Sequence, residues 1–268
     1  MKRFLLRLAR ILAIAYLGIV LLMLFLERSL VFVPSLYPDG DWRPSNLAFE
    51  DAEFSAPDGT RLHGWFMPHE HPRAVILFSH GNGGNLSDRA DILRDLHRLG
   101  AAVMIFDYRG YGRSEGSPDE AGILSDARAA RAWLAKQAAI DEKQIVQMGE
   151  SLGGGVSVDL AAADGARGLV LISTFTSLPD AAAAHYPWLP VRLLMRTRLD
   201  SLAKIGNYHG PLLQVHGDSD RIVPFALGKR LFDAANEPKR FVTIRGGDHN
   251  DPPASEFDQA LDQFLGEL

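Results

Sequence analysis

The stretch that decides the fold is Gly149-Glu150-Ser151-Leu152-Gly153, which lies between an apolar run, 144–148, and a run of small and apolar residues that extends to position 163. These flanks predict a buried strand before the motif and a helix packed on a sheet after it. A serine on such a sharp turn adopts a sparsely populated backbone conformation, and glycines two positions away on each side leave room for it. The motif therefore predicts a nucleophilic serine hydroxyl raised on a strand-to-helix turn.

Composition limits the possible chemistry. The chain has 268 residues, of which 47% are hydrophobic and 23% charged, and this fits one α/β catalytic domain. Its net charge of −5 gives no sign of a basic surface that would bind phosphate groups, so we expect no nucleic-acid partner. With no cysteine, disulfides, thiolate metal sites and cysteine nucleophiles are excluded. We expect no metal and no cofactor, because His69-Glu70-His71 lacks a third ligand in pattern and no phosphate-binding glycine motif is present.

The N-terminus predicts a membrane anchor over residues 1–28. Four basic residues lie within the first ten positions, and Ile11 to Leu26 then runs for 16 residues without a charge. A bilayer core needs roughly 20 apolar residues, and terminal arginines can reach back to the headgroups. A cleaved signal peptide is the alternative, although its apolar core is normally shorter and ends in small residues. The basic flank predicts a cytoplasmic N-terminus and a catalytic domain outside, which is periplasmic if the source is bacterial.

The rest of the chain predicts a linker and one α/β domain, residues 47–268. Prolines and a glycine within 29–46 indicate a linker that lifts the domain off the membrane. Runs 47–54 and 61–67 flank a Pro-Asp-Gly turn and predict an antiparallel hairpin at a sheet edge. Apolar strands then alternate with helices, which predicts a mostly parallel sheet covered on both faces. The expected strands are 74–79, 102–107, 144–148, 168–173, 211–216 and 240–244, and the expected helices are 86–99, 122–137 and 255–268.

An acid and a base follow the last two expected strands. Asp220 lies in the segment 216–224 and His249 in the segment 246–251. The order serine, aspartate, histidine is the order that a serine motif on such a turn requires, because each group lies on a loop at the same edge of the sheet. We expect His249 to accept the Ser151 proton and Asp220 to orient the imidazole. Asp218 is the alternative acid.

A glycine-rich loop, His80-Gly81-Asn82-Gly83-Gly84-Asn85, directly follows the expected strand 74–79. Glycines let backbone N–H groups approach a bound oxygen closely. We therefore expect an oxyanion hole in which one donor is the N–H of Asn82 and the other is the N–H of Leu152. An ordinary glycine-rich loop is the alternative.

In four motifs the chain resembles the α/β-hydrolase superfamily. They are His80-Gly81-Asn82, Asp107-Tyr108-Arg109-Gly110-Tyr111-Gly112-Arg113-Ser114, the serine motif and residues 217–224. Within that superfamily it resembles small serine hydrolases with an N-terminal signal anchor, a branch related to the ABHD-type depalmitoylases and to the prolyl-oligopeptidase catalytic domain. The resemblance covers residues from about Leu47 onward and implies that Ser151, Asp220 and His249 form the catalytic triad. The chain lacks the cysteine-rich N-terminus of the depalmitoylases and the propeller of the peptidases.

An insertion at 179–207 is long enough to form a short helical cap over the site. Its apolar side chains are expected to bind the acyl part of a substrate, with arginines at the outer edge. The alternative is a helix packed on the core. The expected substrate-binding residues are Tyr186, Trp188, Leu193 and Leu194.

Together these patterns predict a serine hydrolase that cleaves carboxylic esters or thioesters through an acyl-enzyme on Ser151. The expected substrate is a small-molecule or lipid-derived acyl ester, and the expected membrane contact is the N-terminal helix. One alternative is a serine peptidase or amidase of prolyl-oligopeptidase type. Another is a noncatalytic, membrane-anchored ligand-binding protein. The sequence leaves the role of Glu150 open.

Overall fold

A computed structural model of the chain describes residues 1–251 and 255–268. In this part of the chain, one sheet has eight strands in the order β10-β9-β8-β7-β4-β6-β3-β2. All neighbours are parallel except β2–β3 and β3–β6. The strands are β2 Glu50–Ser55, β3 Arg61–Met67, β4 Ala74–Ser79, β6 Ala101–Phe106, β7 Ile145–Glu150, β8 Gly168–Ile172, β9 Leu212–Gly217 and β10 Lys239–Ile244. The expected mostly parallel sheet and its edge hairpin, β2–β3, are confirmed.

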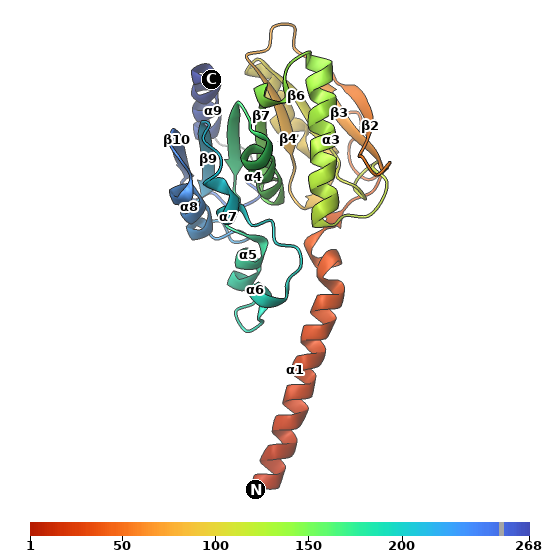
Figure 1. Ribbon diagram of the computed structural model, residues 1–268, viewed down its shortest axis with the longest axis vertical. Helices are drawn as coiled ribbons and strands as arrows, with labels where there is room; N and C mark the ends of the chain where they lie inside the picture. Colours follow the sequence, from red (N-terminus) through yellow and green to blue (C-terminus); the bar gives the residue numbers. More distant parts are fainter. Residues whose placement is uncertain (252–254) are drawn as a thin grey trace.

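Helices cover both faces of this sheet (Figure 1). On one face, α3 (Glu120–Ala138) and α4 (Leu152–Asp164) bury Ile123, Leu134 and Val156. On the other face, α2 (Ala90–Arg98) and α9 (Ser255–Glu267) bury Leu93 and Leu261. The central strands are apolar along their whole length because both of their faces are buried.

Further short elements complete the domain. A 3₁₀ turn, η1 (Leu86–Arg89), begins the helix expected at 86–99, and η2 (Glu142–Gln144) precedes β7. The expected cap contains α5 (Leu178–His185), α6 (Val191–Leu194) and α7 (Ser201–Ile205). Helix α8 (Phe225–Ala234), which the sequence patterns did not predict, links β9 to β10.

Helix α1 (Lys2–Val31) projects away from the domain (Figure 1). It is long enough and apolar enough to cross a membrane: its most apolar 18 residues have a mean hydropathy of 2.5, and 6% of them are buried. Because the helix continues to Val31, it extends beyond the expected anchor boundary at residue 28.

Residues 29–46 do not form the spacer that their prolines predicted. After α1 ends, β1 (Val33–Pro34) pairs in parallel with β5 (Gly83–Gly84). Further along the segment, Trp42 is buried in the core that lies under α2 and α9. Prolines prevent a helix there, but a buried tryptophan and a strand pair attach this segment to the domain.

Candidate active site

The serine motif forms a sharp turn between β7 and α4. Ser151 has φ 52° and ψ −115°, a backbone conformation that few non-glycine residues adopt. A Cβ on Gly149 would lie 2.2 Å from the carbonyl oxygen of Gly153, and one on Gly153 would lie 1.9 Å from that of Ser79. Both positions therefore exclude any larger residue, which is why the turn needs glycine on each side of the serine.

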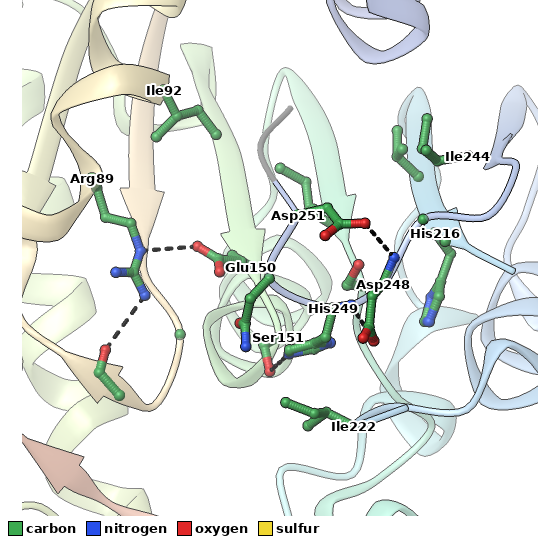
Figure 2. Close-up of a pocket in the computed structure, with 18 of the residues that line it drawn as sticks. Arg89, Ile92, Glu150, Ser151, His216, Ile222, Ile244, Asp248, His249 and Asp251 are labelled. Carbon is green, nitrogen blue, oxygen red and sulfur yellow. Dashed lines mark hydrogen bonds and ion pairs between the residues drawn. The ribbon is translucent and has the colours of Figure 1, made fainter. Parts of the chain in front are cut away.

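Ser151, His249 and Asp220 form a continuous hydrogen-bonded chain. His249 Nε2 lies 3.0 Å from Ser151 Oγ, and His249 Nδ1 lies 2.7 Å from Asp220 Oδ2. Figure 2 shows Ser151 and His249 pointing toward each other. The three loops meet because β7, β9 and β10 are parallel and their carboxyl ends share one edge of the sheet. The structure thus brings together the three side chains predicted from the sequence.

Asp220 is held by more groups than the sequence predicted. Its Oδ1 accepts hydrogen bonds from the backbone N–H groups of Ile222 and Val223, at 2.9 and 2.7 Å. Its Oδ2 also lies 3.3 Å from Nε2 of the buried His216. Burial by itself would raise the pKa of this carboxyl, but the hydrogen bonds from His216 and His249 outweigh it and hold the pKa well below its ordinary value.

Asp218, the alternative acid, contacts the backbone of the loop after β10, whereas His249 Nδ1 contacts Asp220. The Oδ1 atom of Asp218 accepts a hydrogen bond of 2.7 Å from the backbone N–H of Gly246, and its side chain is exposed. It therefore ties the loop after β9 to the loop after β10. His216 was missed, although its position at the end of β9, four residues before Asp220, is a signal that could have indicated contact with the acid.

The two expected oxyanion donors flank the serine. Asn82 lines the cavity in front of Ser151, and Leu152 begins α4 immediately after it. Within residues 1–251 and 255–268, neither of these backbone N–H groups has a protein acceptor. The carbonyl of Asn82 accepts hydrogen bonds from Tyr111 Oη and from the backbone N–H of Val33, at 2.8 and 3.1 Å. These bonds fix the peptide plane next to the site.

Ser151 opens into a cavity of about 600 Å³ at the carboxyl edge of the sheet. Such a volume is in the range of small-molecule sites. Charged and apolar side chains share its walls (Figure 2). The apolar lining residues, none of which was predicted from sequence, are Ile92, Ile172, Val215, Ile222, Ile244 and Phe257.

An ion pair crosses one wall of this cavity. Arg89 Nε lies 3.1 Å from Glu150 Oε2, and Arg89 Nη2 donates a hydrogen bond of 3.4 Å to the carbonyl of Gly83 (Figure 2). Arg89 therefore connects the residue before the serine to the glycine-rich loop. This contact gives Glu150 a structural partner that the sequence did not indicate.

The four expected substrate-binding residues of the cap do not line this cavity. Instead, Trp188 contacts Tyr16 of α1, and Leu194 lies beside Leu24 of the same helix. The cap is held against α1 because Glu27 of that helix accepts hydrogen bonds from the backbone N–H groups of Arg196 and Thr197, which follow α6. The acyl-binding role predicted for Tyr186, Trp188, Leu193 and Leu194 is therefore not supported by their positions.

The described part of the chain has no cluster of three or more histidine, aspartate or glutamate side chains that could hold a metal ion. His69, from the histidine-rich surface segment, packs edge-on against the ring of His97 at 5.4 Å.

Comparison with known proteins places the chain in a family. Residues 70–202 match the family described as serine aminopeptidase, S33. The chain is 42% identical over 244 residues to the uncharacterized protein Rv2307c of Mycobacterium tuberculosis, covering 90% of this chain and 87% of that protein. It is 35% identical over 261 residues to the alpha/beta hydrolase domain-containing protein WAV2 of Arabidopsis thaliana, covering 87% of this chain and 84% of that protein. The chain belongs to the α/β-hydrolase superfamily.

A solved structure shows the same fold. The Pyrococcus furiosus esterase Pf2001 superimposes with a TM-score of 0.73 at 19% identity, covering 88% of this chain and 98% of that one. At this identity the likeness extends to the fold alone.

Proposed function

We propose that this chain is a serine hydrolase that cleaves carboxylic esters or thioesters through an acyl-enzyme on Ser151. The observation that carries the proposal is the hydrogen-bonded chain from Ser151 through His249 to Asp220, placed at the wall of a cavity. A noncatalytic ligand-binding protein has no need for this geometry or for the backbone strain at Ser151.

Acylation begins when Ser151 Oγ attacks the substrate carbonyl carbon and its proton moves to His249 Nε2. The carbonyl oxygen becomes an oxyanion, which the N–H groups of Asn82 and Leu152 stabilise. The tetrahedral intermediate then collapses, the bond to the leaving oxygen or sulfur breaks, and His249 returns the proton to that atom. Asp220 holds the imidazole in the required tautomer and stabilises its charged form.

Deacylation repeats these steps with water. His249 removes a proton from a water molecule, whose oxygen attacks the acyl carbon. The second intermediate collapses to the free acid, and the proton on His249 returns to Ser151 Oγ. The apolar side chains of the cavity, such as Ile172 and Ile222, support an acyl chain as the group that binds there.

We also infer that α1 is retained as a single membrane span, with the N-terminus cytoplasmic and the catalytic domain on the other side, which is periplasmic in a bacterium. The basic residues at the start of α1 support this orientation. Membrane attachment favours small-molecule or lipid-derived acyl esters as substrates.

A peptidase or amidase is the second candidate, favoured by the description of the matching family as a serine aminopeptidase. A substrate panel separates the two candidates: p-nitrophenyl esters from acetate to palmitate, a palmitoyl thioester and a proline amide, each assayed with the native protein and with Ser151→Ala. The proposal expects hydrolysis of esters or thioesters that is lost in the variant. A preference for the amide would replace it with the peptidase assignment.

A further inference from the structure

The segment that follows α5 contacts α1 at two heights along that helix. We call residues 186–195, which include the short helix α6, the α5–α6 loop. Near the end of α1, the buried carboxylate of Glu27 accepts hydrogen bonds of 2.9 and 2.7 Å from the backbone N–H groups of Arg196 and Thr197. Nearer the start of α1, Tyr16 Oη donates a hydrogen bond of 3.0 Å to the carbonyl of Trp188. The loop therefore lies alongside the helix (Figure 1).

The contact between Tyr16 and Trp188 lies within the apolar part of α1. A helix rises 1.5 Å per residue, so the uncharged run from Ile11 to Leu26 is about 24 Å long, and Tyr16 lies about 15 Å from its end at Leu26. A bilayer core is about 30 Å thick, so the entire run is needed to cross it. A membrane that contains α1 must then also contain the tip of the α5–α6 loop at Trp188.

The exposed side chains of the loop suit this location. Leu193 is 85% exposed, more than any other large apolar side chain after residue 31 in the described residues. Trp188 is 53% exposed and Tyr186 43% exposed. Each of these two rings has an apolar body that acyl chains can cover.

Most of the loop's backbone N–H groups are satisfied within the protein, which favours an apolar medium because each unsatisfied polar group is costly there. Pro187 and Pro190 have no N–H group to satisfy. The carbonyl of Trp188 accepts the hydrogen bond from the Tyr16 hydroxyl. The N–H groups of Trp188, Val191 and Arg192 have no protein acceptor in the described part of the chain, whereas five other N–H groups donate to backbone carbonyls, namely those of Tyr186, Leu189, Leu193, Leu194 and Met195.

Positive charge borders the same surface. Arg192, Arg196 and Arg198 are exposed, and they follow or lie within the loop. Arg192 pairs with Asp180 at 2.6 Å, whereas no carboxylate lies within pairing distance of the Arg196 guanidinium in the part of the chain that is described. Long arginine side chains can reach from an apolar layer to lipid phosphates, and each adds to the attraction toward an anionic leaflet.

We propose that the α5–α6 loop is a second membrane contact, which inserts beside α1 into the leaflet on the domain side of a bilayer that contains anionic lipids. This rests on the proposed retention of α1 as a membrane span. The contact places the catalytic cavity next to the bilayer, because His185, at the end of α5, donates a hydrogen bond of 2.7 Å from Nε2 to the carbonyl of Ile222, a residue that lines the cavity.

Single-cysteine labelling tests this directly, because the natural chain has no cysteine. The full-length variants Leu193→Cys, Phe25→Cys and Gln263→Cys are labelled with an environment-sensitive NBD fluorophore and reconstituted into phosphatidylcholine–phosphatidylglycerol vesicles. Phe25 is exposed on α1, and Gln263 is exposed on α9 at the far end of the domain. Lipids with a nitroxide on the acyl chain then quench those labels that lie in the apolar layer.

The inference expects a loss of fluorescence for Leu193→Cys that is comparable with the loss for Phe25→Cys and several-fold larger than that for Gln263→Cys. Quenching for Phe25→Cys without quenching for Leu193→Cys would overturn the loop contact and leave the anchor in place. No quenching for either would overturn both. An unchanged thermal unfolding midpoint for each variant excludes misfolding as the cause.

Discussion

The side-chain amide of Asn82 donates a hydrogen bond of 3.0 Å to the carbonyl oxygen of Val31, the last residue of α1. Asn82 is also the residue whose backbone N–H we assign to the oxyanion hole. The end of the apolar helix and the glycine-rich loop are thus joined by this bond and by the β1–β5 pair beside it. Positioning of the oxyanion donor therefore depends on how α1 enters the domain.

Replacement of Asn82 by alanine is expected to lower kcat about tenfold and to leave KM nearly unchanged. The variant keeps the backbone N–H but loses the bond that positions the loop, and a misplaced oxyanion donor weakens binding of the transition state. Steady-state kinetics on p-nitrophenyl acetate measures the effect.

Asn236→Ala is the matched control, because that side chain also donates to backbone carbonyls, those of Gly206 and Tyr208, away from the cavity. Each variant is expected to lose about 1 kcal/mol of stability per hydrogen bond. Equal kinetics in the two variants would show that the Asn82 bond is structural only.

The acid limb of log(kcat/KM) against pH is expected to have a slope of one. The pKa of Asp220 is held below its ordinary value, so the carboxylate and the stability it contributes persist above about pH 4 and are lost only as the pH falls through the lower folded-state pKa. Asp220 therefore takes up no proton above about pH 4, and a single proton on the general base accounts for the acid limb there. A slope of two above about pH 4 would show that Asp220 also takes up a proton there.

Glu150→Gln is expected to lower KM about three- to tenfold for an ester whose acyl part ends in a carboxylate. The substitution removes the negative partner of Arg89 and leaves an unpaired guanidinium in the cavity wall. The KM for the neutral p-nitrophenyl butyrate is expected to stay the same. Glu267→Gln, which breaks a surface pair with Arg240, is the control and changes neither value. An equal change for both esters would contradict a role for Arg89 in binding anions.

Local patterns were enough to predict the sheet, the turn at Ser151 and the order of the three polar residues. Alternating apolar strands and helices indicated a parallel sheet, and a parallel sheet brings the carboxyl ends of its strands together whatever the loops contain. Asp220 and His249 could therefore be placed beside Ser151 without any knowledge of distances.

The cavity lining and the direction of the cap could not be predicted this way. Ile92, Ile244 and Phe257 come from separate elements, and their convergence depends on packing that no local pattern records. The cap leans toward α1 through hydrogen bonds between Glu27 and backbone groups 169 and 170 residues away, and a single glutamate in an apolar helix gave no sign of that partner.

Labelling by a fluorophosphonate tests the central claim, that Ser151 is the nucleophile, because this probe forms a bond only with an activated serine. We expect the purified full-length protein in detergent to be labelled at one site, which peptide mass spectrometry assigns to Ser151. Ser151→Ala is expected to lose the label. Ser157→Ala, a change of a buried hydroxyl on α4, is expected to retain it. Persistent labelling of a natively folded Ser151→Ala variant would contradict the account.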